Sequence, residues 1–396
     1  MIAPQKLRIL MLCPQYRPVL GGYERAAERL SIGLVKQGHE VTVLTERTNR
    51  AWPANEVLDG VEVSRAWCLC RRGVQTLSAL WSLAWFLVVQ GRQFDVWHAH
   101  QYGIRTAIAI AMGKIMRRPV VMKLTSTGSQ GLAAHLDREY VSTLVRRLHL
   151  RLDAVVATTR ETQAEAVGFG IAPSRVHLFG NAIDIEEFRP RSDTERSELR
   201  ATLGIQSRGI VVYVGRFSPE KNPLFLIQAW SQVAGELPGW KLIFLGEGPL
   251  EADVRASIKI HGLADTVIVA GRQSNVPEWI GASDIYALPS VREGLSNSLI
   301  EAMASALPSV CTPVSGVDEL VKAPGAGFIR PQGDVTAFAA ALVTLAKDPG
   351  LRLQMGRVAR RTAESRFAIN VIVEQHVRLY EQLIAEKRQG ASGKDA

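Results

Sequence analysis

Two basic residues, Arg216 and Lys221, follow the apolar run IVVYV in the stretch GRFSPEKNP. The run is short and rich in β-branched residues, so it predicts a buried strand. Ser218 as an N-cap, with Pro219 at the first helical position, predicts that a helix starts directly afterwards. Backbone N–H groups at a helix N-terminus favour an anion, so two cations here fit a diphosphate. Charges in turns are also often merely solvated, and this stretch alone leaves both interpretations open.

A second pair of candidates, Glu293 and Glu301, lies in SVREGLSNSLIEAMA. Glu293 follows a predicted strand, and Glu301 lies inside a helix expected to start near Ser296 to Ser298. The carboxylates would lie on the order of 10 Å apart, because a helix rises ~1.5 Å per residue. They therefore fit two hydroxyls of one extended polar ligand better than a shared proton or metal ion. The alternatives are a solvated loop charge for Glu293 and a helix surface charge for Glu301, although its apolar neighbours indicate a buried helix.

Further candidates follow strands in the first half of the chain. Gly21 and Gly22 lie in a turn between the first predicted strand and a helix, where the backbone could approach a phosphate closely. Glycines at such turns are also common packing features, and the G-x-G-x-x-G fingerprint is absent. His98 and His100, in DVWHAH, lie at the carboxyl end of another predicted strand. They are either site residues or buried packing histidines.

These residues must be positioned by strands, and the first half of the chain alternates β-branched runs with helical patterns. The predicted strands are Leu7–Cys13, Val41–Thr45, Val61–Ala66, Val96–Ala99, Val120–Leu124, Ala154–Thr158 and Val176–Phe179. The predicted helices are Glu24–Lys36, Thr76–Val89, Thr106–Met116, Glu139–Leu150 and Thr162–Val167. This alternation predicts a parallel sheet with helices on both faces.

The pattern then starts again, which predicts a second doubly wound α/β domain. Its predicted strands are Ile210–Val214, Lys241–Leu245, Val267–Ala270, Ile285–Leu288 and Ser309–Cys311, and its predicted helices are Leu224–Leu237, Leu250–His261 and Ser298–Ala304. Ser192 and Glu195 make a capping box for a short helix near the boundary. We expect domains at 1–190 and 191–370, and a crossing helix with a polar tail at 371–396. Ligands bind at the carboxyl ends of such strands, so a cleft shared by both domains is expected.

Composition limits the class of protein. The chain has 396 residues, of which 47% are hydrophobic and 21% charged, as in a folded protein with two or three domains. The four cysteines, Cys13, Cys68, Cys70 and Cys311, are too scattered for a disulfide framework and indicate reduced thiols in the cytoplasm. The uncharged run Thr76–Val89 is shorter than the ~20 residues of a membrane span, so it predicts a buried or surface-lying helix.

Taken together, GRFSPEKNP, GEGPL, REGLSNSLIEAMA and GNAIDIEEFRP resemble, in order and spacing, the family 4 retaining glycosyltransferases with the GT-B fold. The resemblance covers nearly the whole chain. It implies an enzyme without cofactor or metal ion, whose donor substrate is a nucleotide-diphosphate sugar. By resemblance, Arg216 and Lys221 neutralise the leaving diphosphate, while Glu293 contacts the transferred sugar. The other residues implied at the donor are Glu301 at the ribose, Gly21, Gly22, Gly215, Gly246, Gly271, Asn297, Ser298 and Leu299.

One position departs from the family pattern. Many members carry a histidine near the sugar, where Thr125 aligns in this chain. Either Lys123, His98 or His100 does that work, or the alignment is displaced. These four residues are candidates for the sugar or acceptor side of the site.

Positive charge is concentrated in residues 60–151, which hold 13 Lys and Arg against four Asp and Glu. This asymmetry indicates an anionic partner for the first domain, which by resemblance receives the acceptor. The segment Arg138–Arg151 predicts a helix with Val141, Leu144, Val145 and Leu148 on one face and Arg146, Arg147 and Arg151 nearby. Such a helix either binds an anionic membrane from the cytoplasm or packs on its own sheet. No Phe, Tyr or Trp lies among Arg146, Arg147 and Arg151, which argues against nucleic acid.

The resulting expectation is a cytoplasmic, peripheral glycosyltransferase of cell-envelope or exopolysaccharide synthesis, with a lipid-linked or saccharide acceptor. A sugar-nucleotide epimerase of the same fold and a two-lobed ligand-binding protein are the alternatives. The donor's base and sugar, the acceptor, the linkage and the oligomeric state stay open.

Overall fold

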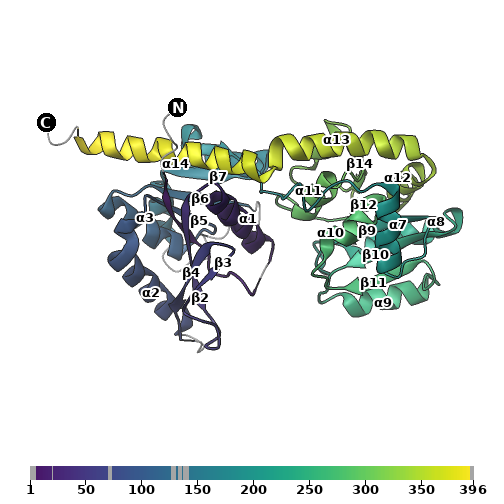
Figure 1. Ribbon diagram of the computed structural model, residues 1–396, viewed down its shortest axis with the longest axis horizontal. Coiled ribbons are helices and arrows are strands. Elements are labelled where there is room, and N and C mark those ends of the chain that lie inside the picture. The colour runs from purple at the N-terminus through teal and green to yellow at the C-terminus, as the bar shows by residue number, and fades with distance from the viewer. Residues whose placement is uncertain are drawn as a thin grey trace. The chain divides into compact units, whose positions relative to one another are not determined.

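Apolar runs buried on both faces form two separate, mainly parallel sheets, each covered by helices (Figure 1). The computed structural model describes residues 6–19, 21–69, 74–125, 131–132, 136 and 142–392. The chain divides into unit 1, Met1–Ala182 with Ile369–Ala396, and unit 2, Ile183–Ala368. The predicted α/β class with two doubly wound units is thereby confirmed.

Unit 1 holds an eight-stranded sheet in the order β3-β4-β2-β1-β5-β6-β7-β8. Only β3 is antiparallel to its neighbour. The strands are β1 Arg8–Leu12, β2 Glu40–Arg47, β3 Asn55–Leu58, β4 Val61–Trp67, β5 Val96–Ala99, β6 Val120–Leu124, β7 Ala154–Ala157 and β8 Val176–Leu178. The described helices are α1 Gly22–Lys36, α2 Gln75–Gln90, α3 Ile104–Met116, α5 Ser142–His149, α6 Arg160–Phe169 and α14 Ile369–Ser392.

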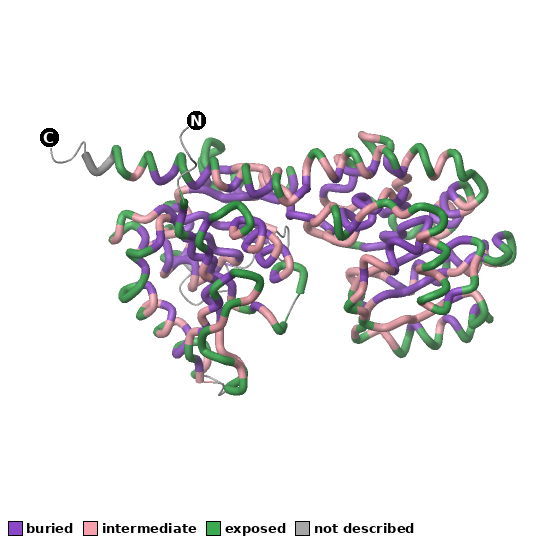
Figure 2. The backbone as a smooth tube through the Cα atoms, viewed as in Figure 1, coloured by how far each residue is buried: buried purple, intermediate pink, exposed green. Residues whose placement is uncertain are grey.

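Successive residues of β1 explain why its sequence is continuously apolar. Ile9 and Met11 pack on one side of the sheet, whereas Leu10 and Leu12 pack on the other. Helices α1 and α14 cover the first side (Figures 1 and 2). A Cβ on Gly33 of α1 would lie 2.7 Å from side-chain atoms of Ile369 and Val373 in α14. The glycine therefore allows these two helices to pack closely.

Unit 2 holds a six-stranded parallel sheet in the order β11-β10-β9-β12-β13-β14. The strands are β9 Gly209–Val214, β10 Trp240–Leu245, β11 Val267–Gly271, β12 Ile285–Leu288, β13 Ser309–Cys311 and β14 Gly327–Ile329. The helices are α7 Asp193–Thr202, α8 Pro223–Val233, α9 Glu251–Ile260, α10 Val276–Gly281, α11 Asn297–Ala304, α12 Val335–Lys347 and α13 Pro349–Phe367. The predicted capping box starts α7: the Ser192 hydroxyl accepts from the Glu195 N–H, and the Glu195 carboxylate accepts from the Ser192 N–H.

The chain passes between the units after Ala182 and after Ala368, whereas the sequence places these divisions at about residues 190 and 371. The segment before residue 190 packs on unit 2, where Phe188 is buried and its carbonyl accepts from Arg360. The Ile183 N–H donates to the Phe367 carbonyl at 2.8 Å. Both connections therefore leave unit 2 side by side.

Candidate active site

The loop after β9 carries the two cations predicted to meet a diphosphate. Arg216 is exposed and Lys221 is half-buried. The helix predicted at Leu224–Leu237 begins at Pro223, with Asn222 at its N-cap in the left-handed region (φ 49°). The earlier start that Ser218 and Pro219 predict is wrong, and Arg216 and Lys221 belong to a turn that precedes the helix.

Hydrogen bonds explain this turn. The N–H groups of Lys221 and Asn222 both donate to the Ser218 carbonyl, so Pro219 lies in a turn and not in a helix. The Glu220 carbonyl accepts from the Val291 N–H at 2.8 Å. This hydrogen bond ties the turn to the loop after β12.

Lys221 and Glu293 form an ion pair across these two loops. Lys221 Nζ lies 2.5 Å from Oε1 and 2.6 Å from Oε2 of Glu293. The Ser290 hydroxyl donates to the same Oε1 at 2.8 Å. The sequence predicts separate contacts of these two residues with a donor, and their separation of 72 positions gives no sign of the pairing.

Both predicted carboxylates are held inside the fold. The Glu293 side chain is 7% exposed, and Glu301 is 4% exposed within α11. A solvated loop charge at Glu293 and a surface charge at Glu301 are therefore both excluded. Each carboxylate follows β12, at the carboxyl edge of the unit 2 sheet.

Helix α11 begins where the sequence predicts, at Asn297. The hydroxyl of its N-cap, Ser296, accepts from the Leu299 N–H at 3.4 Å. The Tyr286 hydroxyl donates to Ser298 Oγ at 2.7 Å, which ties the first turn of the helix to β12.

Three of the predicted glycines lie where strands of unit 2 end. The Gly246 N–H donates to the Gly271 carbonyl at 2.8 Å, and the Gly215 N–H donates to the Leu245 carbonyl at 3.0 Å. A Cβ on Gly246, whose φ is 143°, would lie 1.9 Å from the Gly215 carbonyl oxygen. Gly246 is therefore required for the close approach of two strand ends, and donor contact at these glycines stays a prediction.

Gly21 and Gly22 start α1 in unit 1, with Gly21 as the N-cap. The Gly21 N–H donates to Glu24 Oε2 at 2.9 Å, and Glu24 is buried. A carboxylate from the same helix thus satisfies one of the N–H groups expected to meet a phosphate. A phosphate that binds the Gly21 N–H has to displace Glu24.

His98, His100 and Lys123 lie in a buried cluster with His376 and Tyr380 of α14. His98 Nδ1 lies 2.6 Å from the Tyr380 hydroxyl, and the ring centroids of His98 and His100 are 4.5 Å apart. Within the described residues, the Nε2 atoms of the three histidines have no hydrogen-bond partner. Burial lowers the pKa of His98 and His100 well below its ordinary value, and it lowers the pKa of Lys123 to about 8.

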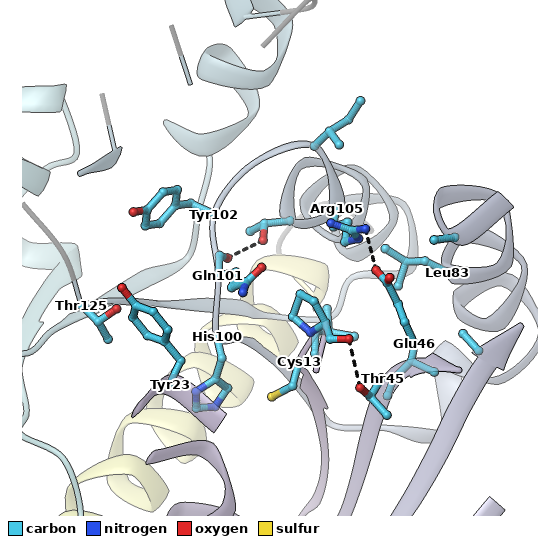
Figure 3. A pocket seen from close by; sticks show the side chains of 17 residues that line it. Cys13, Tyr23, Thr45, Glu46, Leu83, His100, Gln101, Tyr102, Arg105 and Thr125 are labelled. Atoms are coloured by element: carbon cyan, nitrogen blue, oxygen red, sulfur yellow. Dashed lines mark hydrogen bonds and ion pairs between the residues drawn. The ribbon is translucent and has the colours of Figure 1, made fainter. Parts of the chain in front are cut away.

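A cavity of about 270 Å³ opens in unit 1, and Figure 3 shows the side chains around it. His100 and Thr125, both predicted candidates, line it, whereas His98 packs against α14. The apolar part of its wall consists of Leu12, Leu44, Ala66, Ala79, Leu83 and Ile104. The cavity therefore combines an apolar wall with a few polar groups, as small-molecule sites do.

An ion pair that the sequence analysis missed lies on this wall. Arg105 Nη2 approaches Glu46 Oε1 to 2.5 Å (Figure 3). Burial raises the pKa of Glu46, and Arg105 opposes that rise. No motif surrounds either residue, but Glu46 lies near the carboxyl end of a predicted strand, which is where site residues were sought.

The helix predicted to carry a membrane-binding face packs largely on its own unit. In α5, Val145 is buried and Leu148 packs against the core, while Leu144 is exposed. Arg146 lies over the ring of Phe169 at 4.4 Å. The packing alternative is therefore correct for Val145 and Leu148. Arg138 and Val141 lie outside the described residues.

Cys13, Cys68 and Cys311 are buried and form no disulfide with one another, and Cys70 lies outside the described residues. Burial raises the pKa of the Cys13 and Cys311 thiols, which keeps them protonated. Within the described ranges, no helix is long and apolar enough to cross a membrane.

Two doubly wound units with charged side chains at strand ends match glycosyltransferases of known structure. Anabaena HepE in complex with UDP and glucose superposes with a TM-score of 0.77 at 21% identity, covering 95% of this chain and 99% of that one. This likeness establishes the GT-B fold.

Sequence comparison gives the family. Residues 20–187 match Glycosyltransferase Family 4, and residues 208–348 match Glycosyl transferases group 1. N-acetyl-alpha-D-glucosaminyl L-malate synthase of Bacillus anthracis is 26% identical over 97% of this chain and 99% of its own. UDP-Gal:alpha-D-GlcNAc-diphosphoundecaprenol alpha-1,3-galactosyltransferase of Escherichia coli is 24% identical over 94% and 97%. The chain belongs to the family 4, group 1 glycosyltransferases, and the protein is a glycosyltransferase.

Proposed function

We propose that the protein transfers a sugar from a nucleoside-diphosphate donor to a lipid-linked or saccharide acceptor, in the synthesis of cell-envelope or exopolysaccharide. Transfer retains the anomeric configuration and needs no metal ion. Unit 2 holds the donor and unit 1 the acceptor, and the protein works at the cytoplasmic face of a membrane. The names of the two relatives, one of which acts on a diphosphoundecaprenol-linked acceptor, support this assignment.

The observation that carries the proposal is the Lys221–Glu293 pair at the carboxyl edge of unit 2, beside exposed Arg216. Without a donor, each charge of the pair neutralises the other. A diphosphate competes for Lys221, because its charge exceeds that of one carboxylate. Glu293 is then released to accept a hydrogen bond from the sugar. Arg216 and Lys221 stabilise the charge that develops on the leaving diphosphate, as fixed cations in a preorganised site do.

Calorimetry with UDP or GDP alone tests the division of roles. Glu301→Gln should weaken diphosphate binding, because Glu301 is assigned to the ribose. Glu293→Gln should leave this affinity nearly unchanged and lower turnover at least about 100-fold, since its partner is the sugar. Equal losses of affinity in both variants would reject the assignment.

A screen of nucleotide sugars by thermal unfolding identifies the donor, because a ligand that binds only the folded state raises Tm. Transfer should then survive EDTA. Within the described residues, no group of three or more His, Cys, Asp and Glu is placed to hold a metal ion. Activity lost on chelation and restored by Mg²⁺ or Mn²⁺ contradicts the metal-independent reaction. Release of free sugar or an isomerised nucleotide sugar without any acceptor points to the epimerase instead.

A further inference from the structure

The outward face of α2 is apolar and aromatic. Its large side chains Leu77, Trp81, Trp85, Val88 and Val89 are each between 54% and 67% exposed. Leu77, Trp81 and Trp85 follow one another at four-residue spacing, so they form one stripe along the helix. The rings of Trp81 and Trp85 stack with centroids 5.8 Å apart.

The opposite face of the same helix is buried. Ser78, Ala79, Leu83 and Leu87 face the interior of unit 1. Ala79 and Leu83 also line the cavity shown in Figure 3, where Leu83 is labelled. One helix therefore separates the cavity from the exposed stripe.

Cations outnumber acids near the end of this stripe. Helix α2 contains no charged residue, and residues 74–118 hold five Lys and Arg against one Asp. The C-terminal ends of α2 and α3 lie together, because Arg118 donates to the Arg92 carbonyl at 2.5 Å. Arg92 and Arg117 are exposed there, beside Ile115, which is 73% exposed.

We infer that α2 docks the protein on an anionic bilayer, with Trp81 and Trp85 in the headgroup region and Arg92 and Arg117 near the lipid phosphates. Tryptophan favours the membrane interface, and an apolar face bordered by cations is typical of helices that lie in it. The helix has 16 residues, fewer than the ~20 of a span, so it lies on the membrane. A second copy of this chain fits less well, because its own cations would meet those of the first copy.

The inference rests on the proposed function in one respect. If α2 docks on the bilayer, the cavity lined by Ala79 and Leu83 lies on the other side of that helix. A lipid-linked acceptor held in the bilayer would then be close to the cavity. Membrane binding itself needs no donor and no transfer, so it is measured separately.

Sedimentation with vesicles of phosphatidylglycerol and phosphatidylcholine, without nucleotide sugar, tests the inference. The natural protein should bind these vesicles and release them as salt rises. Trp81→Ser/Trp85→Ser should raise the lipid concentration for half-binding at least about tenfold. The matched control is Ile260→Ser/Leu353→Ser, which removes two exposed apolar side chains from unit 2 and should bind normally.

Two further measurements keep the result specific. Lipids brominated near the headgroup should quench part of the tryptophan fluorescence of the natural protein and none of it in Trp81→Ser/Trp85→Ser. Both exposed positions tolerate serine, so Tm and the affinity for UDP or GDP should be unchanged in that variant. A folded variant that keeps the nucleotide affinity of the natural protein but binds no vesicles supports the docking face independently of catalysis.

Three outcomes overturn the inference. The first is a natural protein that ignores anionic vesicles at low salt. The second is vesicle binding that survives Trp81→Ser/Trp85→Ser but is lost in Arg147→Glu/Arg151→Glu, which places the contact near α5. The third is a dimer in sedimentation velocity that the double serine variant abolishes, which makes the face a protein interface.

Discussion

Lys221 and Glu293 show how two residues 72 positions apart form one ion pair. The carboxylate is nearly buried, with Lys221 and Ser290 as its partners. Removal of the lysine leaves that carboxylate without its counter-ion, whereas Arg216 is exposed and can be removed without such a loss.

Lys221→Met should therefore lower both activity and stability. We expect a loss of about 1–3 kcal/mol in the free energy of unfolding, because a buried charged acceptor loses its partner. Arg216→Ala should change stability by less than about 0.5 kcal/mol. Both variants should lower turnover at least about 100-fold. Urea denaturation and steady-state kinetics measure the two effects.

The double variant Lys221→Met/Glu293→Gln provides the control. It removes the unpaired charge, so stability should return toward that of the natural protein while turnover stays low. If Lys221→Met unfolds at the same urea concentration as the natural protein, the ion pair contributes nothing to stability. Near-normal rates in both single variants would disprove the leaving-group role.

At the residue scale, the sequence could indicate which side chains lie near strand ends but not which of them touch. Glu301 was expected in a buried helix from its apolar neighbours, and it lies there. The hydrogen bond between Glu24 and Gly21 and the Glu46–Arg105 pair were missed. Ion pairs between distant segments leave no local pattern in a sequence.

At the scale of elements, strands buried on both faces were predictable because most of their positions are apolar. Strand β3 was missed, since its residues alternate between exposed and half-buried and lack an apolar run. The apolar pattern predicts α8 from Leu224, one residue after its observed start, whereas Ser218 and Pro219 wrongly predict an earlier start. The Glu220 carbonyl in that turn accepts a hydrogen bond from the Val291 N–H, a contact that local sequence does not encode.

The contact of α14 with β5 makes the stability of unit 1 depend on pH. His376 is fully buried against His98, and burial lowers its pKa from 6.5 to about 3. In the unfolded chain the same imidazole takes up a proton below pH 6.5. The contribution of His376 to stability is thus constant above about pH 6.5 and falls as pH drops toward 3, by up to about 1.4 kcal/mol per pH unit.

His376→Gln should make the free energy of unfolding depend less steeply on pH, because the contribution of one imidazole is removed. Urea denaturation at pH 7, 6 and 5 measures this change. A slope identical in the natural protein and His376→Gln would mean that His376 is protonated in the folded state.

At the scale of the whole molecule, unit 2 is one continuous segment and unit 1 is not. The core of unit 1 includes six apolar side chains from α14, namely Ile372, Val373, Leu379, Tyr380, Leu383 and Ile384. At about 1.5–3 kcal/mol for each buried side chain, their sum reaches the 5–15 kcal/mol or so that stabilises a typical domain.

A fragment of residues 183–368 should therefore fold alone, with one cooperative unfolding transition and, if the proposed function holds, binding of UDP or GDP. A fragment of residues 1–182 should not fold until a peptide of residues 369–392 is added. Circular dichroism during urea titration distinguishes these cases. Cooperative unfolding of the 1–182 fragment on its own would show that α14 is dispensable for the core of unit 1.

The return of α14 to unit 1 also fixes an order of events on the ribosome. Domains usually fold in the order in which they are synthesised. Here the segment made first lacks the helix that closes its core until all of residues 183–368 have been translated. Unit 2 can complete its fold while unit 1 still exposes the apolar side of α1 and β1. During that interval the nascent chain offers chaperones a binding surface that the finished protein covers with its own last helix.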